Sequence, residues 1–185
     1  MKFNNVENEM VVLPDGREVW LSRSIAVSGA IFAWRQDDEY PFVLISERGP
    51  GTPDFQGYEN LVCGYLDKNE TGTDAIIREV WEEVGLNLLN IINSDRDSII
   101  HMEQPWFVNT DPNDSNRQNV TLRYGMCFLV GINEELPSLT TKYNAKVGEV
   151  VNPRWVKINE ISELIFAFGH EKVINEYFDL ITKHY

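Results

Sequence analysis

The chain has 185 residues, of which 43% are hydrophobic and 11% aromatic, enough for one domain with a substantial core. A net charge of −13 and an isoelectric point near 4.6 leave no basic footprint for a nucleic acid polymer or an anionic membrane surface. Two cysteines are too few for a disulfide framework, so we expect a protein of the reducing cytoplasm. The first ten residues lack the apolar segment of a signal peptide, and no apolar run reaches membrane-spanning length.

The first third of the chain predicts strands. Residues 10–21 hold two short apolar runs around a Pro-Asp-Gly turn, which indicates a β-hairpin. Two runs rich in β-branched and aromatic residues, 24–34 and 41–46, predict further strands. Residues 47–60 contain prolines and glycines without periodicity, so we expect a long loop that covers a ligand.

The rest of the chain mixes helices and strands. Residues 73–84 carry apolar side chains at helical spacing, including Val80 and Trp81, with Thr73 as the N-cap and Gly85 after the last turn. Strands are predicted at 61–66, 99–108, 119–132 and 149–158, a loop at 109–118, and helical segments at 159–168 and 170–185. This order predicts an α/β (α+β) fold in which helices cover a mixed sheet.

Three carboxylates lie close together on the predicted helix. Glu79, Glu82 and Glu83 stand at i, i+3 and i+4, so they share one face, on the solvent side and away from the core. Carboxylate oxygens at this spacing suit Mg²⁺ or Mn²⁺ and leave room for substrate phosphates. The alternative is a solvated acidic face, which is the usual role of an acidic run.

The residues before these carboxylates favour the metal site. From Gly64 the chain reads Gly, five residues, Glu, seven residues and then Arg-Glu-Val-Trp-Glu-Glu-Val-Gly-Leu. This pattern resembles the Nudix box at all of its defined positions, which are Gly64, Glu70, Arg78, Glu79, Val80, Glu82, Glu83, Gly85 and Leu86. The resemblance implies a Nudix-type α/β/α sandwich with a mixed sheet over residues 23–185, and residues 1–22 as an N-terminal hairpin extension.

The resemblance also implies an activity, which is hydrolysis of the diphosphate linkage in a nucleoside diphosphate derivative. Glu79, Glu82 and Glu83 would bind Mg²⁺ or Mn²⁺, and a tight turn at Gly64 would aim the Cys63 carbonyl at the metal. Metal ions and an activated water then supply most of the catalysis.

Other residues have supporting roles or are candidates for the general base. Arg78 can pair with Glu82 at i+4, and Glu70 is expected to bond the loop backbone or Arg78 rather than a metal. Gly85 ends the helix. The general base is expected to be Glu82 or, as the second choice, Glu149, for which an exposed loop glutamate is the alternative.

The substrate is the feature that the sequence determines least. Phe55 and Tyr58 are candidates to stack on a base, and Arg48 and Arg123 to meet phosphate or ribose. Further candidates are Trp34, Trp106 and Arg117, and a packing or surface role is open for all of them. The hairpin extension and the Ala-Phe-Gly-His sequence at 167–170 resemble sugar-nucleotide-cleaving members, so ADP-ribose or a related sugar nucleotide is expected; dinucleotides and oxidised nucleoside triphosphates stay open. No chemistry is assigned to His101, His170 or His184.

Two other functions remain open. A Nudix-type nucleotide sensor would bind a ligand without turning it over. An enzyme similar to isopentenyl-diphosphate isomerase would use Cys63 as a catalytic cysteine, but that enzyme has a Gly-His pair where this chain has Gly64 and Tyr65.

The hairpin leads us to expect a homodimer. An isolated two-stranded hairpin is marginally stable, and the apolar residues of this one, at 11–13 and 19–20, need a packing partner. Two-fold dimers are the commonest soluble assemblies. The alternative is that the hairpin extends the edge of its own sheet.

Overall fold

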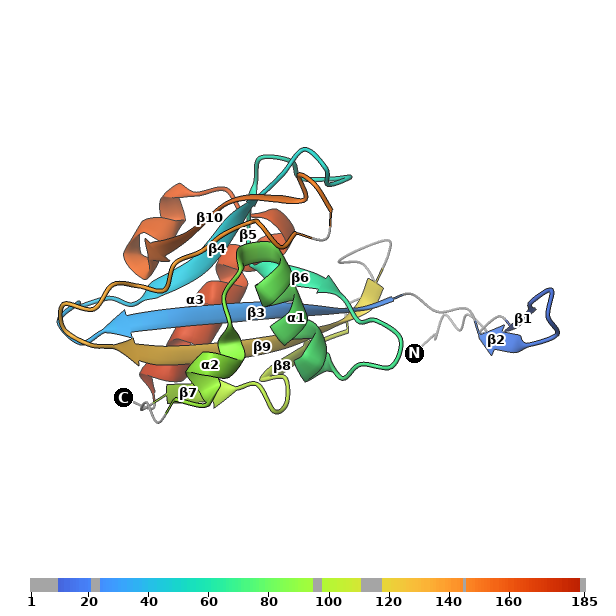
Figure 1. Cartoon of the computed structure of the whole chain (residues 1–185), viewed down its shortest axis with the longest axis horizontal. Helices are drawn as coiled ribbons and strands as arrows, with labels where there is room; N and C mark the ends of the chain where they lie inside the picture. The colour runs from blue at the N-terminus through green and yellow to red at the C-terminus, as the bar shows by residue number, and fades with distance from the viewer. Residues whose placement is uncertain (1–9, 21–23, 95–97, 111–117, 145, 184–185) are drawn as a thin grey trace, which may run out of the picture.

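A mixed β-sheet lies at the centre of the fold (Figure 1). The computed structural model describes residues 10–20, 24–94, 98–110, 118–144 and 146–183. Within these residues the sheet has eight strands, in the order β10-β4-β3-β9-β7, with β5 on β4, β6 on β3 and β8 on β9. Only β3 and β9 pair in parallel among them. The strands are β3 (Ser24–Arg35), β4 (Phe42–Arg48), β5 (Glu59–Asn60), β6 (Val62–Tyr65), β7 (Ser98–His101), β8 (Phe107–Asn109), β9 (Gln118–Val130) and β10 (Val150–Lys157).

Helices cover both faces of this sheet. Figure 1 shows α1 (Gly72–Val84) and α2 (Leu88–Ile92) in front of it and α3 (His170–Thr182) behind. Two short 3-10 helices, η1 (Ile158–Glu163) and η2 (Ala167–Gly169), connect β10 to α3. The predicted α/β/α sandwich with a mixed sheet is therefore confirmed. No helix in the described ranges is long and apolar enough to cross a membrane.

The central strand β3 supplies both cores because its side chains alternate between the two faces. Val27 and Ile31 pack in the cluster that includes the apolar face of α1. Ala30 and Phe32 pack in the cluster that includes α3. Residues 26–33 of β3 are buried, and β6 pairs antiparallel with this buried part of the strand at residues 26–29.

The start of α1 differs from the predicted one. Thr71, not Thr73, is the N-cap: its hydroxyl accepts from the Asp74 N–H at 3.1 Å, and the Asp74 carboxylate accepts from the Thr71 N–H at 3.2 Å. This reciprocal pair is a capping box. The Thr73 hydroxyl instead donates to the Met102 carbonyl at 2.6 Å. At the other end, Gly85 is left-handed at φ 69°, as predicted for a helix stop.

Several other predicted elements need correction. The strand expected at 99–108 is two short strands, β7 and β8, and the helical segment expected at 159–168 is two 3-10 helices, η1 and η2, separated by residues 164–166. The expected loop 47–60 ends in β5, α2 was not predicted, and residues 111–117 of the expected loop 109–118 lie outside the described ranges. Trp81 does not join the core, because it is exposed and stacks on Tyr143 with ring centroids 4.3 Å apart.

The N-terminal hairpin forms as predicted. Strands β1 (Met10–Val12) and β2 (Glu18–Trp20) pair antiparallel, and Gly16 supplies the positive φ, 84°, of the turn. They form a separate two-stranded sheet, so the alternative that the hairpin extends the main sheet is wrong. Met10, Val11 and Val12 are exposed within the chain. The division into an extension and a catalytic domain stays a prediction.

Candidate active site: a carboxylate cluster on a cavity wall

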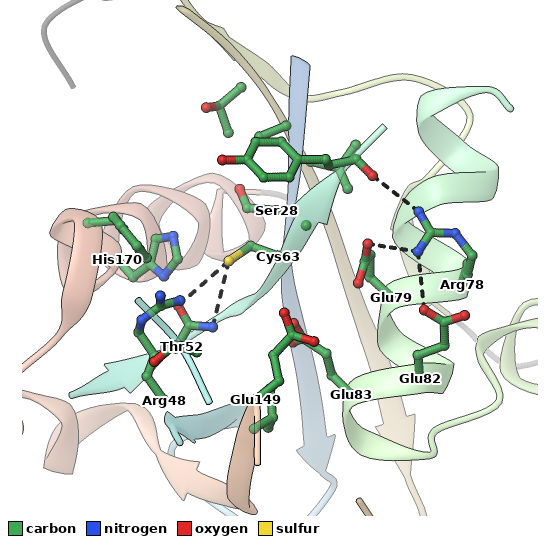
Figure 2. Close-up of a pocket in the computed structure, with 18 of the residues that line it drawn as sticks. Ser28, Arg48, Thr52, Cys63, Arg78, Glu79, Glu82, Glu83, Glu149 and His170 are labelled. Carbon is green, nitrogen blue, oxygen red and sulfur yellow. Dashed lines mark hydrogen bonds and ion pairs between the residues drawn. The ribbon is translucent and has the colours of Figure 1, made fainter. Parts of the chain in front are cut away.

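A cavity of about 490 Å³ lies between α1, β6, the end of β4 and the first turn of α3. This volume is typical of a small-molecule site. Figure 2 shows the carboxylates of α1 on one side of Cys63, and Arg48 and His170 on the other. The cavity therefore joins an acidic wall to a wall that carries nitrogen donors.

Arg78 organises the acidic wall. Its Nη1 donates to Glu79 Oε1 at 2.8 Å and to Glu82 Oε2 at 3.2 Å. Its Nε and Nη2 donate to both oxygens of Glu70, at 3.1 and 2.7 Å, and Nη2 also donates to the Tyr65 carbonyl at 3.1 Å. The Glu70 carboxylate also accepts from the Asp67 N–H at 2.7 Å, and the bond from Arg78 lowers the pKa of Glu70. Arg78 thus fixes three carboxylates and offsets their repulsion.

Glu83 is buried, against the prediction that it shares the solvent side of α1. It is 7% exposed because the helix presents this position to β6, and its Oε2 has no hydrogen-bond partner among the described residues. Burial, followed by the charges of Glu79 and Glu149, raises the pKa of Glu83 well above its usual value. Burial also raises the pKa of Glu79, although Arg78 acts in the opposite direction.

Glu149 belongs to the same group of carboxylates although it comes from the other end of the chain. It precedes β10 and lines the cavity, and Figure 2 shows its carboxylate beside that of Glu83. Lys146 Nζ lies 3.6 Å from Glu149 Oε1. The fold thus brings together all of the predicted acidic residues, Glu79, Glu82, Glu83 and Glu149.

This donor set fits a divalent cation. In the described part of the chain, no three His, Cys, Asp or Glu side chains already converge as a complete metal site, and Arg78 occupies oxygens of Glu79 and Glu82. A bound cation would give a partner to the buried carboxylate oxygen that has none, and would offset the repulsion from the two neighbouring carboxylates. Because the donors are all oxygens, Mg²⁺ or Mn²⁺ suits them.

Gly64 contributes to the site in a way that differs from the predicted turn. It lies inside β6, paired with Val27, and not in a turn. A Cβ built at this position would collide with the Glu79 carboxylate. Only glycine therefore lets the strand pass close enough to α1 for Glu79 to reach the cavity.

Cys63 lies next to Gly64 at the centre of the cavity wall. Its Sγ is 3.7 Å from both amide atoms of Asn60, and burial raises the pKa of its thiol to about 12. A hydrogen bond from the Cys63 backbone to Glu83 partly offsets the burial of that carboxylate. The predicted role of its carbonyl as a metal ligand stays a prediction.

The predicted substrate-binding residues separate into two groups. Arg48 and Arg123 line the cavity. Phe55 and Tyr58 lie outside its wall and pack edge to face on each other, 5.6 Å between ring centroids. Phe55 also meets Phe168, which does line the cavity, at 5.0 Å.

Two further candidates, Trp34 and Trp106, are not part of the cavity wall. Trp34 and Trp106 pack against the core on the α3 side of the sheet, and Arg117 lies outside the described residues. Three residues that line the cavity have no spacing pattern in the sequence that would predict this: Asn144, Phe168 and His170. They come from segments distant from the box, and only the fold brings them there.

Comparison with known proteins identifies related domains. A family model described as NUDIX domain matches residues 25–177. Comparison with curated proteins finds no match.

Three solved structures illustrate the likeness of fold. The NUDIX domain of Shewanella oneidensis NrtR complexed with ADP ribose is 14% identical, with 87% of this chain and 90% of that chain covered and a TM-score of 0.55. A Francisella tularensis bifunctional NMN adenylyltransferase/ADP ribose pyrophosphatase, complexed with AMP and a Mn ion, is 18% identical, with 85% and 41% covered and a TM-score of 0.60. A Caenorhabditis elegans Ap4A hydrolase is 14% identical, with 85% and 98% covered and a TM-score of 0.56.

Proposed function

The chain belongs to the Nudix family of pyrophosphohydrolases, and from this premise we propose that it cleaves the diphosphate linkage of a nucleoside diphosphate derivative in a metal-dependent reaction. The observation that carries the proposal is the buried Glu83 carboxylate beside Glu79 and Glu149, whose Oε2 has no hydrogen-bond partner among the described residues. It lies on a cavity whose other wall holds Arg48 and Arg123. One wall suits a cation, and the other suits the acceptor groups of a nucleotide.

The acidic residues divide the work of the proposed reaction. Glu79, Glu82 and Glu83 would hold Mg²⁺ or Mn²⁺, with the Cys63 carbonyl as a further ligand. When bound, the metal would neutralise phosphate charge and help to activate the attacking water. Arg78 keeps Glu79 and Glu82 oriented toward the cavity. The water's proton would pass to Glu82 or Glu149, the two carboxylates predicted as general bases.

ADP-ribose or a related sugar nucleotide is the substrate that we propose. Two structural neighbours support this choice, since one is complexed with ADP ribose and the other is named an ADP ribose pyrophosphatase. The Ap4A hydrolase neighbour keeps dinucleotides as the second choice. A catalytic-cysteine reaction of the isomerase type is disfavoured, because burial keeps the Cys63 thiol protonated at neutral pH.

A substrate panel tests this function. ADP-ribose, other sugar nucleotides, dinucleotides and nucleoside triphosphates are incubated separately with Mg²⁺ or Mn²⁺, and released phosphate esters are measured. The proposal predicts the fastest turnover on ADP-ribose or another sugar nucleotide. Binding of ADP-ribose without turnover of any compound would instead identify a nucleotide sensor.

We also propose that the protein is a homodimer to which the hairpin contributes. The separate β1–β2 sheet and the exposure of Met10, Val11 and Val12 support an interface at this hairpin. Deleting residues 1–21 and measuring mass by light scattering tests the assembly. The full chain should run as a dimer and the truncated chain as a monomer, whereas a monomeric full chain at micromolar concentration would contradict it.

A further inference from the structure

His170 lies on the cavity wall opposite the carboxylates of α1 (Figure 2). It is the first residue of α3 and is 6% exposed. Its ring lies 5.6 Å from that of Phe168, and the Arg48 guanidinium lies over the same Phe168 ring at 4.7 Å. These contacts place an imidazole beside Arg48, deep in the cavity.

The hydrogen bonds of the His170 ring determine which nitrogen carries the proton. Nδ1 accepts from the Leu61 N–H at 3.1 Å, so in the neutral ring the proton is on Nε2. Burial, followed by the charges of Arg123 and Arg48, lowers the pKa of His170 to about 3. Among the described residues Nε2 has no hydrogen-bond partner, so it is a neutral donor on the wall of a cavity.

The charges around this donor indicate the kind of group that it meets. Arg48 Nη2 lies 2.6 Å from Asp54 Oδ1, and Arg123 Nη1 lies 3.2 Å from Glu176 Oε2. Each guanidinium near His170 is therefore already paired with a carboxylate. This part of the wall has donors without a net positive charge, which suits an uncharged acceptor better than a phosphate.

We propose that His170 is a specificity-determining residue whose Nε2–H donates a hydrogen bond to an uncharged acceptor, a sugar hydroxyl or a base atom, on the part of the substrate beyond the diphosphate. The inference rests on the proposed function, since it assumes that a nucleoside diphosphate derivative occupies the cavity. The sequence assigned no chemistry to this histidine, because its neighbours in space come from β4, η2 and the junction between β5 and β6.

The His170→Asn variant removes the Nε2–H donor and can keep the hydrogen bond from the Leu61 N–H. An asparagine oxygen can occupy the place of Nδ1 and accept from the Leu61 N–H, but it offers no donor at the place of Nε2. We expect KM for ADP-ribose to rise about fivefold to tenfold, the value of one hydrogen bond, with kcat changed by less than about threefold. An unchanged KM would overturn the proposal.

His101→Asn is the matched control. His101 also uses Nδ1, which lies 3.0 Å from the Tyr177 hydroxyl, but it is not part of the cavity wall. Its KM and kcat should equal those of the wild type. A rise in KM for both variants would show a general structural effect and would overturn the specific role of His170.

Competitive inhibition distinguishes the uncharged acceptor from a phosphate. AMP, ribose 5-phosphate and inorganic pyrophosphate are compared as inhibitors of the wild type and of His170→Asn. The proposal predicts weaker inhibition by AMP or by ribose 5-phosphate, whichever carries the acceptor, and unchanged inhibition by pyrophosphate. Equal weakening by pyrophosphate would show that His170 meets phosphate and would overturn the proposal.

A measurement that needs no turnover separates this inference from the proposed function. Nitrogen NMR of the full chain should show His170 protonated on Nε2, with a shift of that nitrogen on addition of AMP or ribose 5-phosphate. If the wild type hydrolyses no nucleotide, the proposed function fails, and the NMR shift alone decides the role of His170. Absence of a shift with either compound would overturn it.

Discussion

At the scale of single residues, Glu83 is subject to two opposing demands. Burial without a partner for Oε2 disfavours its charged form, whereas a cation would require that form. A buried ionisable residue with a strongly shifted pKa is typical of a functional site. The neighbouring Glu82 is less constrained, since it is partly exposed and paired with Arg78.

The Glu83→Gln substitution should therefore separate activity from stability. We expect kcat to fall by at least about a hundredfold, while the melting temperature in chelator rises because the buried charge is removed. Glu82→Gln is the matched control, with a similar loss of kcat and no gain in stability. Near-normal rates in both variants would show that the carboxylates form only an acidic surface.

Gly64 offers a second test, because a glycine is needed there for the close approach of β6 to the Glu79 carboxylate and not for a backbone turn. In Gly64→Ala the new methyl group should displace the Glu79 carboxylate and leave the backbone in place, since the collision is with the end of a side chain. We expect kcat/KM to fall by about tenfold or more, with a weaker response to Mg²⁺ titration. Cys63→Ala, one residue away, should keep hydrolytic activity. Equal activity in Gly64→Ala would contradict the role given to this glycine.

His170 should make the stability of the protein sensitive to acid. Its pKa is about 3 when folded and near 6.5 when unfolded, so between these values the unfolded state binds more protons and stability falls as pH falls. At pH 4.5 the loss from this group relative to pH 7 should be about 2–3 kcal/mol, because the pKa difference acts over about two pH units at 1.36 kcal/mol per unit. Denaturant unfolding at pH 7 and 4.5 should show a smaller loss in His170→Asn. Equal losses in both proteins would contradict the lowered pKa.

At the scale of elements, the segment after β9 is attached to the end of α1. Asn144 Nδ2 donates to the carbonyls of Glu82 and Glu83 at 2.8 and 2.9 Å, and the Thr140 N–H donates to the Val84 carbonyl at 2.9 Å. These bonds satisfy carbonyl groups that a helix leaves free at its C-terminus. They also fix the turn of α1 that carries the carboxylates.

Asn144→Ala should loosen that turn. We expect the free energy of unfolding to fall by about 1 kcal/mol and kcat/KM to fall severalfold, because the backbone below Glu82 and Glu83 loses two donors. Denaturant unfolding and steady-state kinetics measure the two effects. The exposed Asn90 on α2 provides the control, and Asn90→Ala should change neither. A loss of activity of the same size in both variants would argue against the attachment.

The elements also show which features the sequence could predict. Helix α1 and its glutamates were predictable because helical periodicity and the box spacing are local. The predicted N-cap, Thr73, is two residues after the observed one, Thr71. Both are threonines, and only the reciprocal hydrogen bonds with Asp74 distinguish Thr71. The burial of Glu83 and the position of His170 in the cavity wall depend on packing between segments that are distant in the sequence. No local residue spacing predicts such packing.

At the scale of the whole molecule, the strong negative charge and the anionic substrate must be reconciled. Like charges on a cavity wall would repel a diphosphate unless a cation intervenes. Arg78, Arg48 and Arg123 do not supply the missing charge, because each is already paired with a carboxylate. We therefore expect turnover of an anionic diphosphate at this site to need a metal ion.

Turnover of ADP-ribose in the presence and absence of a chelator tests the metal requirement. With Mg²⁺ or Mn²⁺, we predict release of AMP and ribose 5-phosphate. With excess EDTA, we predict that the rate falls to the level of the enzyme-free control and recovers when the metal is restored. Undiminished hydrolysis in EDTA would contradict the metal-dependent account.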